Sequence, residues 1–210
     1  MSEQVKRDYD KKALKKITSV EKKAKKLPGI DESLIQSFWE LLNFFPKISE
    51  PGLEERLEKF ILGATPGQYF AMQCALFAAA TPYLLEDERV CSLLKSLSGN
   101  SCGLAVTGEY ESTVTFDNLN FKIERGISSK KIPVISISSR KDYAEVVLGR
   151  KDPIKMLISG KIRATHKLTL LKWGLPHVNL LRQRDLFEKS LAYQEEAEEI
   201  LDENLKKMGY

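Results

Sequence analysis

Three cysteines and two histidines are the side chains in this sequence best suited to metal binding or nucleophilic chemistry. Cys74, Cys91 and Cys102 are odd in number and widely spaced, so no CxxC pair exists, and His166 and His177 lie eleven residues apart with no cysteine nearby. Zinc sites and thioredoxin-type redox sites need closer spacing of ligands or thiols. The cysteines therefore indicate a reducing compartment, of which the cytoplasm is the simplest.

Sequence motifs of catalysis are missing as well. The chain contains no GxSxG, HExxH, phosphate-binding GxxxxGKS/T or dinucleotide-binding GxGxxG pattern. His166 and His177 have the chemistry of general bases, but neither has a carboxylate partner at a fixed spacing, and Cys74 lies in an alanine-rich run typical of a buried thiol. Because an active site needs several convergent groups, we expect no catalytic residue, no metal ligand, no cofactor and no enzymatic activity.

These residues belong to a chain of 210 residues, of which 42% are hydrophobic and 30% are charged. This length and apolar fraction suffice for a hydrophobic core without disulfides or metals, in one large domain or one domain with an extension. No segment approaches the roughly 18 uncharged apolar residues of a membrane span. The N-terminus is charged from Glu3 onward and lacks the apolar core of a signal peptide, so the sequence predicts a cytoplasmic protein.

The formal net charge of +4 hides an uneven distribution. Residues 1–26 carry ten Lys or Arg against four Asp or Glu, whereas residues 182–210 carry five against eight. The apolar residues of the basic head recur every three or four positions, which predicts one helical stripe. The stripe consists of Val5, Tyr9, Ala13, Ile17, Val20, Ala24 and Leu27.

This basic helix, residues 1–28, has more than one expected partner. A narrow stripe with two alanines and no Phe or Trp favours packing on the body or on the acidic tail. Docking on an anionic membrane surface or on a protein partner is the first alternative, and contact with nucleic-acid phosphates is less favoured.

The sequence from 31 to 99 predicts four helices. Asp, Thr and Pro residues provide their start signals, and Pro or Gly residues end them. Residues 67–80 contain no acid or base, as expected of a helix buried on most sides. Thr81-Pro82 repeats the start signal and predicts a break before the fourth helix.

Beyond about residue 102 the hydrophobic period changes from that of a helix to that of a strand. Apolar and polar residues alternate through 113–116, 119–124 and 135–138, with a turn at Asp117-Asn118. This pattern indicates an antiparallel meander with one apolar face. The signal for a strand at 104–106 is weaker.

Helical signals then return and alternate with one more strand. Ser139 and Asp152-Pro153 are cap signals for two short helices, and residues 161–165 alternate as a strand. A helical segment from Leu168 is expected to be interrupted by Gly174 and Pro176. Residues 178–208 predict one long amphipathic helix with glutamates on its outer face.

Between Lys131 and about Leu175 several features follow one another in a fixed order. An alternating strand precedes a short helix, then the turn Gly149-Arg150-Lys151-Asp152-Pro153, then Gly160-Lys161-Ile162-Arg163 at the start of a strand. This order resembles the sterol carrier protein 2-like lipid-binding family, over roughly residues 100–180. The family often has a glycine shortly after the last strand begins, where this chain has Thr165-His166.

The resemblance implies an α+β fold in which a mainly antiparallel five-stranded sheet is covered by helices, with an apolar tunnel for a lipid tail. The lipid-binding domain would span 100–180, between a helical region at 31–99 and an acidic amphipathic helix at 181–210. The same apolar residues would also make an ordinary closed core. The candidate cavity residues are Val114, Phe116, Phe121, Ile123, Ile135, Ile137, Tyr143, Val147, Ile154, Met156, Leu157, Leu168 and Leu171.

We therefore expect a non-enzymatic carrier that holds a long-chain lipid, a fatty-acyl chain or an isoprenoid in an apolar cavity. A scaffold or partner-binding subunit in lipid or quinone biosynthesis is the alternative, because a simple carrier does not need the large helical region. A second alternative is nucleic-acid binding through the basic helix. A homodimer formed through the C-terminal helix is compatible with each of these functions.

Overall fold

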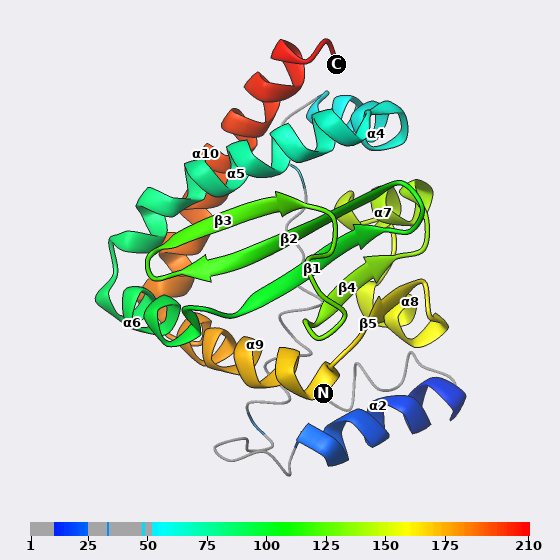
Figure 1. Cartoon of the computed structure of the whole chain (residues 1–210), viewed down its shortest axis with the longest axis vertical. Coiled ribbons are helices and arrows are strands. Elements are labelled where there is room, and N and C mark those ends of the chain that lie inside the picture. The colour runs from blue at the N-terminus through cyan, green and yellow to red at the C-terminus, as the bar shows by residue number, and fades with distance from the viewer. Residues whose placement is uncertain (1–10, 25–32, 34–47, 49–51) are drawn as a thin grey trace.

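The computed structural model describes residues 11–24, 33, 48 and 52–210 (Figure 1). Apart from Ser33, the first of the four helices predicted from 31 to 99 lies outside these residues, as do both ends of the basic helix, including Val5, Tyr9 and Leu27. The described helices are α2 (Lys11–Ala24), α4 (Leu53–Gly63), α5 (Pro66–Leu85), α6 (Glu88–Leu97), α7 (Arg140–Val147), α8 (Pro153–Ser159), α9 (Lys167–Leu181) and α10 (Arg184–Lys207). The strands are β1 (Ser101–Val106), β2 (Tyr110–Asp117), β3 (Asn120–Arg125), β4 (Val134–Ile137) and β5 (Ile162–Ala164).

The five strands form one sheet in the order β3-β2-β1-β4-β5, which confirms the α+β class. The sheet is mixed, because β1 and β4 run parallel while the other three pairs are antiparallel. The predicted meander was wrong at this point, since β4 pairs with β1 and not with β3. The chain leaves β3 and crosses the sheet through residues 126–133. A crossover of this kind returns β4 in the same direction as β1, the strand with the weakest sequence signal.

The apolar face of the sheet matches the one that the alternation predicts. The register pairs Val114 with Ile123, Phe116 with Phe121, and Leu104 with Ile135, so these side chains share a face with Ile137. Helix α5 packs on this face: the rings of Phe77 and Phe121 have centroids 5.0 Å apart.

The opposite face carries polar residues and is crossed by residues 126–133. The buried Thr113 hydroxyl donates to the carbonyl of Gly126 at 2.8 Å and accepts from the amide of Ser128 at 2.9 Å. A Cβ atom at Gly103 would lie 2.7 Å from Cδ1 of Ile127 and 2.9 Å from Cγ2 of Val134, so a larger residue at this strand position would require these side chains to shift.

Helix α5 is longer than the sequence predicts. Thr65 and Gln68 form a capping box at its start, but the break expected at Thr81-Pro82 is absent, because the helix continues to Leu85. Pro82 lies in the last turn, where the single hydrogen bond that proline removes costs little. The Thr81 hydroxyl does not cap a new helix; it donates to the carbonyl of Phe77, one turn earlier in α5, at 2.7 Å.

The C-terminal helices divide at a different place from the predicted one. Gly174 and Pro176 lie inside α9, and the chain breaks at Arg182-Gln183 before α10 begins. Leu175 and Val178 are buried, so the packing of α9 outweighs the weak helix propensity of its glycine and proline. The single helix predicted from Val178 to Met208 was therefore wrong in its first residues.

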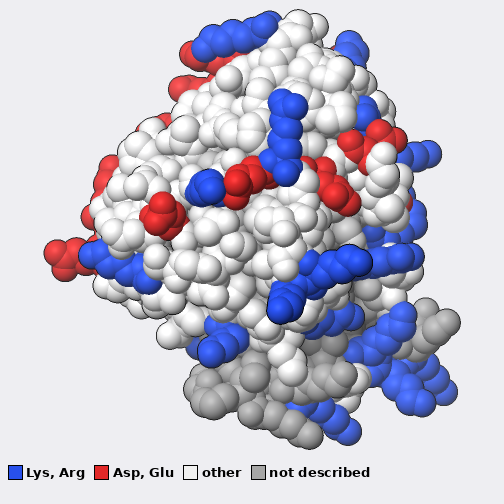
Figure 2. Space-filling model, viewed as in Figure 1, with Lys and Arg blue, Asp and Glu red and all other residues white. Residues whose placement is uncertain are grey.

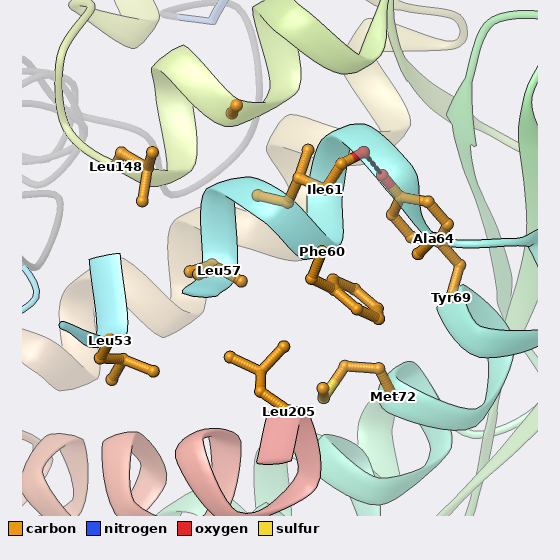
Figure 3. Packing of buried hydrophobic residues seen from close by; sticks show 10 residues of the cluster. Leu53, Leu57, Phe60, Ile61, Ala64, Tyr69, Met72, Leu148 and Leu205 are labelled. Atoms are coloured by element: carbon orange, nitrogen blue, oxygen red, sulfur yellow. Dashed lines mark hydrogen bonds between the residues drawn. The ribbon is translucent and has the colours of Figure 1, made fainter. Parts of the chain in front are cut away.

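The main hydrophobic cluster lies around α4, between α5, α7 and α10 (Figure 3). Leu53, Leu57, Phe60 and Ile61 point from α4 into this cluster, where Leu205 of α10 is fully buried. Figure 1 shows α10 passing behind α5 and the sheet. The Arg56 Nε atom donates to Asp202 at 2.7 Å, so α4 and α10 are joined by an ion pair as well.

Replacing Leu205 with alanine should destabilise the protein by about 2 to 5 kcal/mol, the usual cost of emptying a buried leucine site. The control is Leu62→Ala, because Leu62 lies on α4 with 47% of its side chain exposed and should change the stability by about 0.5 kcal/mol or less. Urea unfolding followed by circular dichroism measures both effects. Equal midpoints for the two variants would show that α10 does not belong to the core.

Candidate ligand cavity

A cavity of about 270 Å³ lies between the apolar face of the sheet and α5, with contributions from α4 and α7. Its walls hold no Asp, Glu, Lys or Arg side chain. The lining residues are Phe60, Tyr69, Met72, Gln73, Leu76, Phe77, Leu104, Ala105, Val106, Tyr110, Ile135, Ile137 and Tyr143.

Two sequence periods build the walls. Positions 69, 72, 73, 76 and 77 follow helical spacing, so they form one stripe of α5 that faces the sheet. The sheet wall comes from the consecutive residues Leu104, Ala105 and Val106 of β1, from the alternate residues Ile135 and Ile137 of β4, and from Tyr110 at the start of β2. The cavity therefore depends on the placement of the uncharged helix over the apolar face.

Three tyrosines and a phenylalanine meet at one end of the cavity. The rings of Tyr69 and Tyr110 stack with centroids 5.4 Å apart, and Phe60 lies 5.2 Å from Tyr69. Tyr143 approaches Tyr69 from α7 at 6.3 Å. Contacts of this kind between aromatic rings add to the stabilisation from burial and hold the rings in fixed orientations.

Two of the three tyrosine hydroxyls have hydrogen-bond partners. Tyr69 donates to the carbonyl of Ile61, as the dashed line in Figure 3 shows, and Tyr110 donates to Gln73 Oε1. The Tyr143 hydroxyl has no partner among the described residues. Burial raises the pKa of all three phenols, so each remains a neutral hydrogen-bond donor at physiological pH.

Arg140 lies next to this end of the cavity with its charge engaged elsewhere. Its guanidinium is 5.5 Å from the ring centre of Tyr69. It donates to the Ala64 carbonyl at 2.7 Å, beyond the C-terminus of α4, and to Glu109 Oε2 at 2.8 Å. The arginine thus ties α7 to α4 and does not line the cavity.

Asp142 holds α7, and with it Tyr143, at the edge of the sheet. Its carboxylate accepts hydrogen bonds from the hydroxyls of Ser138 and Ser139 at 2.8 and 3.0 Å, and from Lys161 Nζ at 2.5 Å. The bond from Lys161 is the main reason why the pKa of Asp142 falls to about 2, from an ordinary value of 3.8. This network connects the end of β4, the start of α7 and the residue before β5.

The structure brings together only part of the predicted site. Of the thirteen candidates, Ile135, Ile137 and Tyr143 line the cavity. Val114, Ile154 and Met156 are buried in packing outside the lining, and Leu168 is 47% exposed on α9. The rest of the predicted set also lies outside the lining, because the wall opposite the sheet is α5 and not the segment 143–171. These other residues are Phe116, Phe121, Ile123, Val147, Leu157 and Leu171.

The α4 and α5 residues of the lining were interpreted from the sequence as ordinary core. Phe60, Tyr69 and Phe77 stand among the aromatic residues of the helical region, and the uncharged run at 67–80 was the available signal. That run predicts burial but not which surface the helix covers.

The histidines and cysteines have local roles in the structure. His177 Nδ1 lies 2.9 Å from the Trp173 carbonyl one turn earlier, and His166 Nδ1 lies 3.2 Å from the hydroxyl of its neighbour Thr165. The three cysteines are free. Within the described ranges, no group of three or more His, Cys, Asp or Glu side chains could hold a metal ion. None of the helices described is long and apolar enough to cross a membrane.

No protein-family model matches the sequence, and no curated protein matches it. Among solved structures, the chain is similar to one described as "UbiJ-SCP2 Ubiquinone synthesis protein". The identity is 9%, the TM-score is 0.36, and the match covers 51% of this chain and 92% of that chain.

The Asp142 network should make stability depend on acid pH. Because its folded-state pKa is depressed, the stabilisation is present above pH 3.8 and is lost as the pH falls towards 2. Asp142→Asn should therefore be less stable than the wild type at pH 6, and the difference should shrink at pH 2.5. Urea midpoints at the two pH values test this, with the exposed Asp117→Asn as control. A difference that stays constant over this range would contradict the role of the carboxylate charge.

Proposed function

We propose that this protein binds the apolar chain of a lipid or isoprenoid in the cavity under α5, and that it does so without catalysing a reaction. The observation that carries the proposal is the cavity itself, which has thirteen lining residues and no charged side chain among them. Ligand pockets are typically apolar, with a few polar groups that fix orientation. Tyr143, Tyr110 and Gln73 are groups of that kind.

The volume supports binding of a chain segment. An apolar cavity of about 150 Å³ in another protein stays dry and binds benzene, so a cavity of about 270 Å³ has room for more than one ring. Typical pockets for small molecules begin at about 300 Å³. A longer chain would need further space, and Met72 in the wall has the flexible side chain that adapts most easily.

Burial of the chain would provide the driving force. Each Å² of apolar area removed from water contributes about 25 cal/mol, without directional contacts. The neutral phenols and the amide in the wall leave no obvious acid, base or nucleophile for a reaction, which favours a carrier over an enzyme. The scaffold function and the homodimer remain predictions.

Filling the cavity should abolish binding. In Leu76→Trp, the larger side chain occupies the space beneath α5, so octane should no longer shift the methyl NMR signal of Met72. In the wild type, octane should shift the Met72 signal and leave that of Met156, which lies outside the lining, in place. Leu168→Trp adds the same residue on the surface and should bind like the wild type. An unmoved Met72 signal in the wild type would refute the proposal.

A second function is favoured by the charge distribution. We propose that the end of the molecule formed by α2, α8 and α9, here called the basic end, docks on an anionic membrane. Residues 153–184 contain seven Lys or Arg and no Asp or Glu, and α2 contains six lysines and one glutamate. Figure 2 shows Lys and Arg gathered at the lower end of the visible face, with most acidic side chains higher.

The packing of α2 supports this docking. Lys16 of α2 donates to the carbonyl of Ile158 in α8 at 2.6 Å, and α2 also contacts α9. The acidic helix α10 packs on α4, α5 and α9. The basic helix therefore adds its charge to an acid-free surface, where the apolar Leu168 is exposed. An exposed apolar residue beside lysines favours a lipid surface over nucleic acid.

Charge-reversal variants should distinguish docking through the basic end from an attraction to anionic membranes that depends only on the net charge of the protein. The triple variant Lys155, Lys167 and Lys172→Glu should bind phosphatidylserine vesicles at least about 10-fold more weakly, because each basic residue near an anionic surface contributes about 1 kcal/mol. The control reverses Lys59, Lys95 and Lys122, which lie on other elements and give the same net charge. Equal vesicle binding by both triple variants, or binding of RNA in place of vesicles, would contradict the docking surface.

A further inference from the structure

The polar groups of the cavity are neutral hydrogen-bond donors. Gln73 Oε1 already accepts from Tyr110, so its amide nitrogen remains as a donor without a partner among the described residues. The Tyr143 hydroxyl is also without a partner there. Ser112 is fully buried on the same sheet face, two residues from Tyr110, and its hydroxyl interacts with the Tyr110 phenol.

No charged side chain lines the cavity to match an ionised ligand. The two arginines nearest the tyrosine end have other partners: Arg140 pairs with Glu109 and backbone carbonyls, and Arg125 lies 4.9 Å from the ring centre of Phe70. A carboxylate or phosphate placed among the lining residues would lose its hydration and gain only neutral donors. Burial of an unpaired charge is far more costly than burial of a neutral oxygen that accepts a hydrogen bond.

We propose that the ligand carries an uncharged acceptor oxygen, as in a ketone, an ester or an alcohol, which receives a hydrogen bond from Tyr143, and that the cavity excludes carboxylates and phosphates. The proposal rests on the proposed binding of an apolar chain and specifies its polar end. Tyr143 is the chosen donor because it is held in place from α7 by the Asp142 network, while its own hydroxyl is unused.

The change in melting temperature caused by Tyr143→Phe distinguishes a ligand-binding role of the hydroxyl from a purely structural one. The Tyr143 hydroxyl makes no hydrogen bond to another described residue, so removing it takes no such bond from the unliganded fold. Tyr143→Phe should therefore keep or raise the melting temperature while it weakens ligand binding. A hydroxyl that stabilised the fold would lower the melting temperature when removed.

Three probes built on the same unbranched run of eight carbons test the proposal: octane, methyl octanoate and octanoate, titrated at pH 8 against the Met72 methyl NMR signal. Methyl octanoate should bind at least about 10-fold more tightly than octanoate, because the charged end cannot be compensated. Tyr143→Phe should weaken binding of methyl octanoate by about 3- to 10-fold, the effect of one net hydrogen bond, and leave octane binding unchanged. The control Tyr193→Phe removes a hydroxyl that bonds Glu86 outside the cavity and should change neither.

The outcomes separate this inference from the function on which it rests. If octane itself fails to shift the Met72 signal, apolar-chain binding is wrong and this inference falls with it. If octane binds but octanoate binds as tightly as its methyl ester, the exclusion of charge is overturned alone. If Tyr143→Phe binds methyl octanoate like the wild type, the assignment of Tyr143 as the donor is overturned.

Discussion

The packing of α5 on the apolar face of the sheet is the contact on which the rest of the structure depends. One side of this helix supplies Tyr69, Met72 and Leu76 to the cavity, and another side receives α10. A charged residue at a position of α5 that faces the sheet, such as Met72 or Leu76, would have to be buried or would push the helix away, whereas Ala71, Ala78 and Ala80 are exposed. Because this run carries no charge, α5 can lie between the sheet with its cavity on one side and α10 on the other.

Several polar groups around the cavity are held by hydrogen bonds to other elements. Arg140 binds the last carbonyls around α4 and a glutamate, Tyr69 binds the Ile61 carbonyl, and Asp142 collects two hydroxyls and a lysine. These bonds orient α4 and α7 relative to the sheet, which keeps the aromatic end in a fixed shape. Against this background, the unused hydroxyl of Tyr143 marks the place where a ligand would complete the hydrogen bonding.

Local signals predicted most elements correctly. Capping residues at Thr65, Ser139 and Asp152 start helices where expected, because a side-chain oxygen that binds the first free amides acts within a few residues. The same kind of signal failed at Thr81-Pro82 and at Gly174. At Pro82 the helix continues because a proline in the last turn removes a single hydrogen bond. At Gly174 the packing of buried neighbours such as Leu175 outweighs the propensity of the local residues.

The sequence by itself determined which residues are apolar, which face of each strand they share, and which helix carries no charge. It overestimated how much of that helix is buried, because only Tyr69 and Met72 of α5 are buried. It also determined the separation of the basic head from the acidic tail, and the order of turns between 131 and 175. Only the tertiary structure decided that β4 lies parallel to β1, that α5 rather than the segment 143–171 forms the opposite wall, and that three tyrosines meet. The physical reason is that alternation and helical periodicity are properties of neighbouring residues. Strand partners and cavity walls depend instead on how distant apolar surfaces pack together, and many pairings bury similar areas.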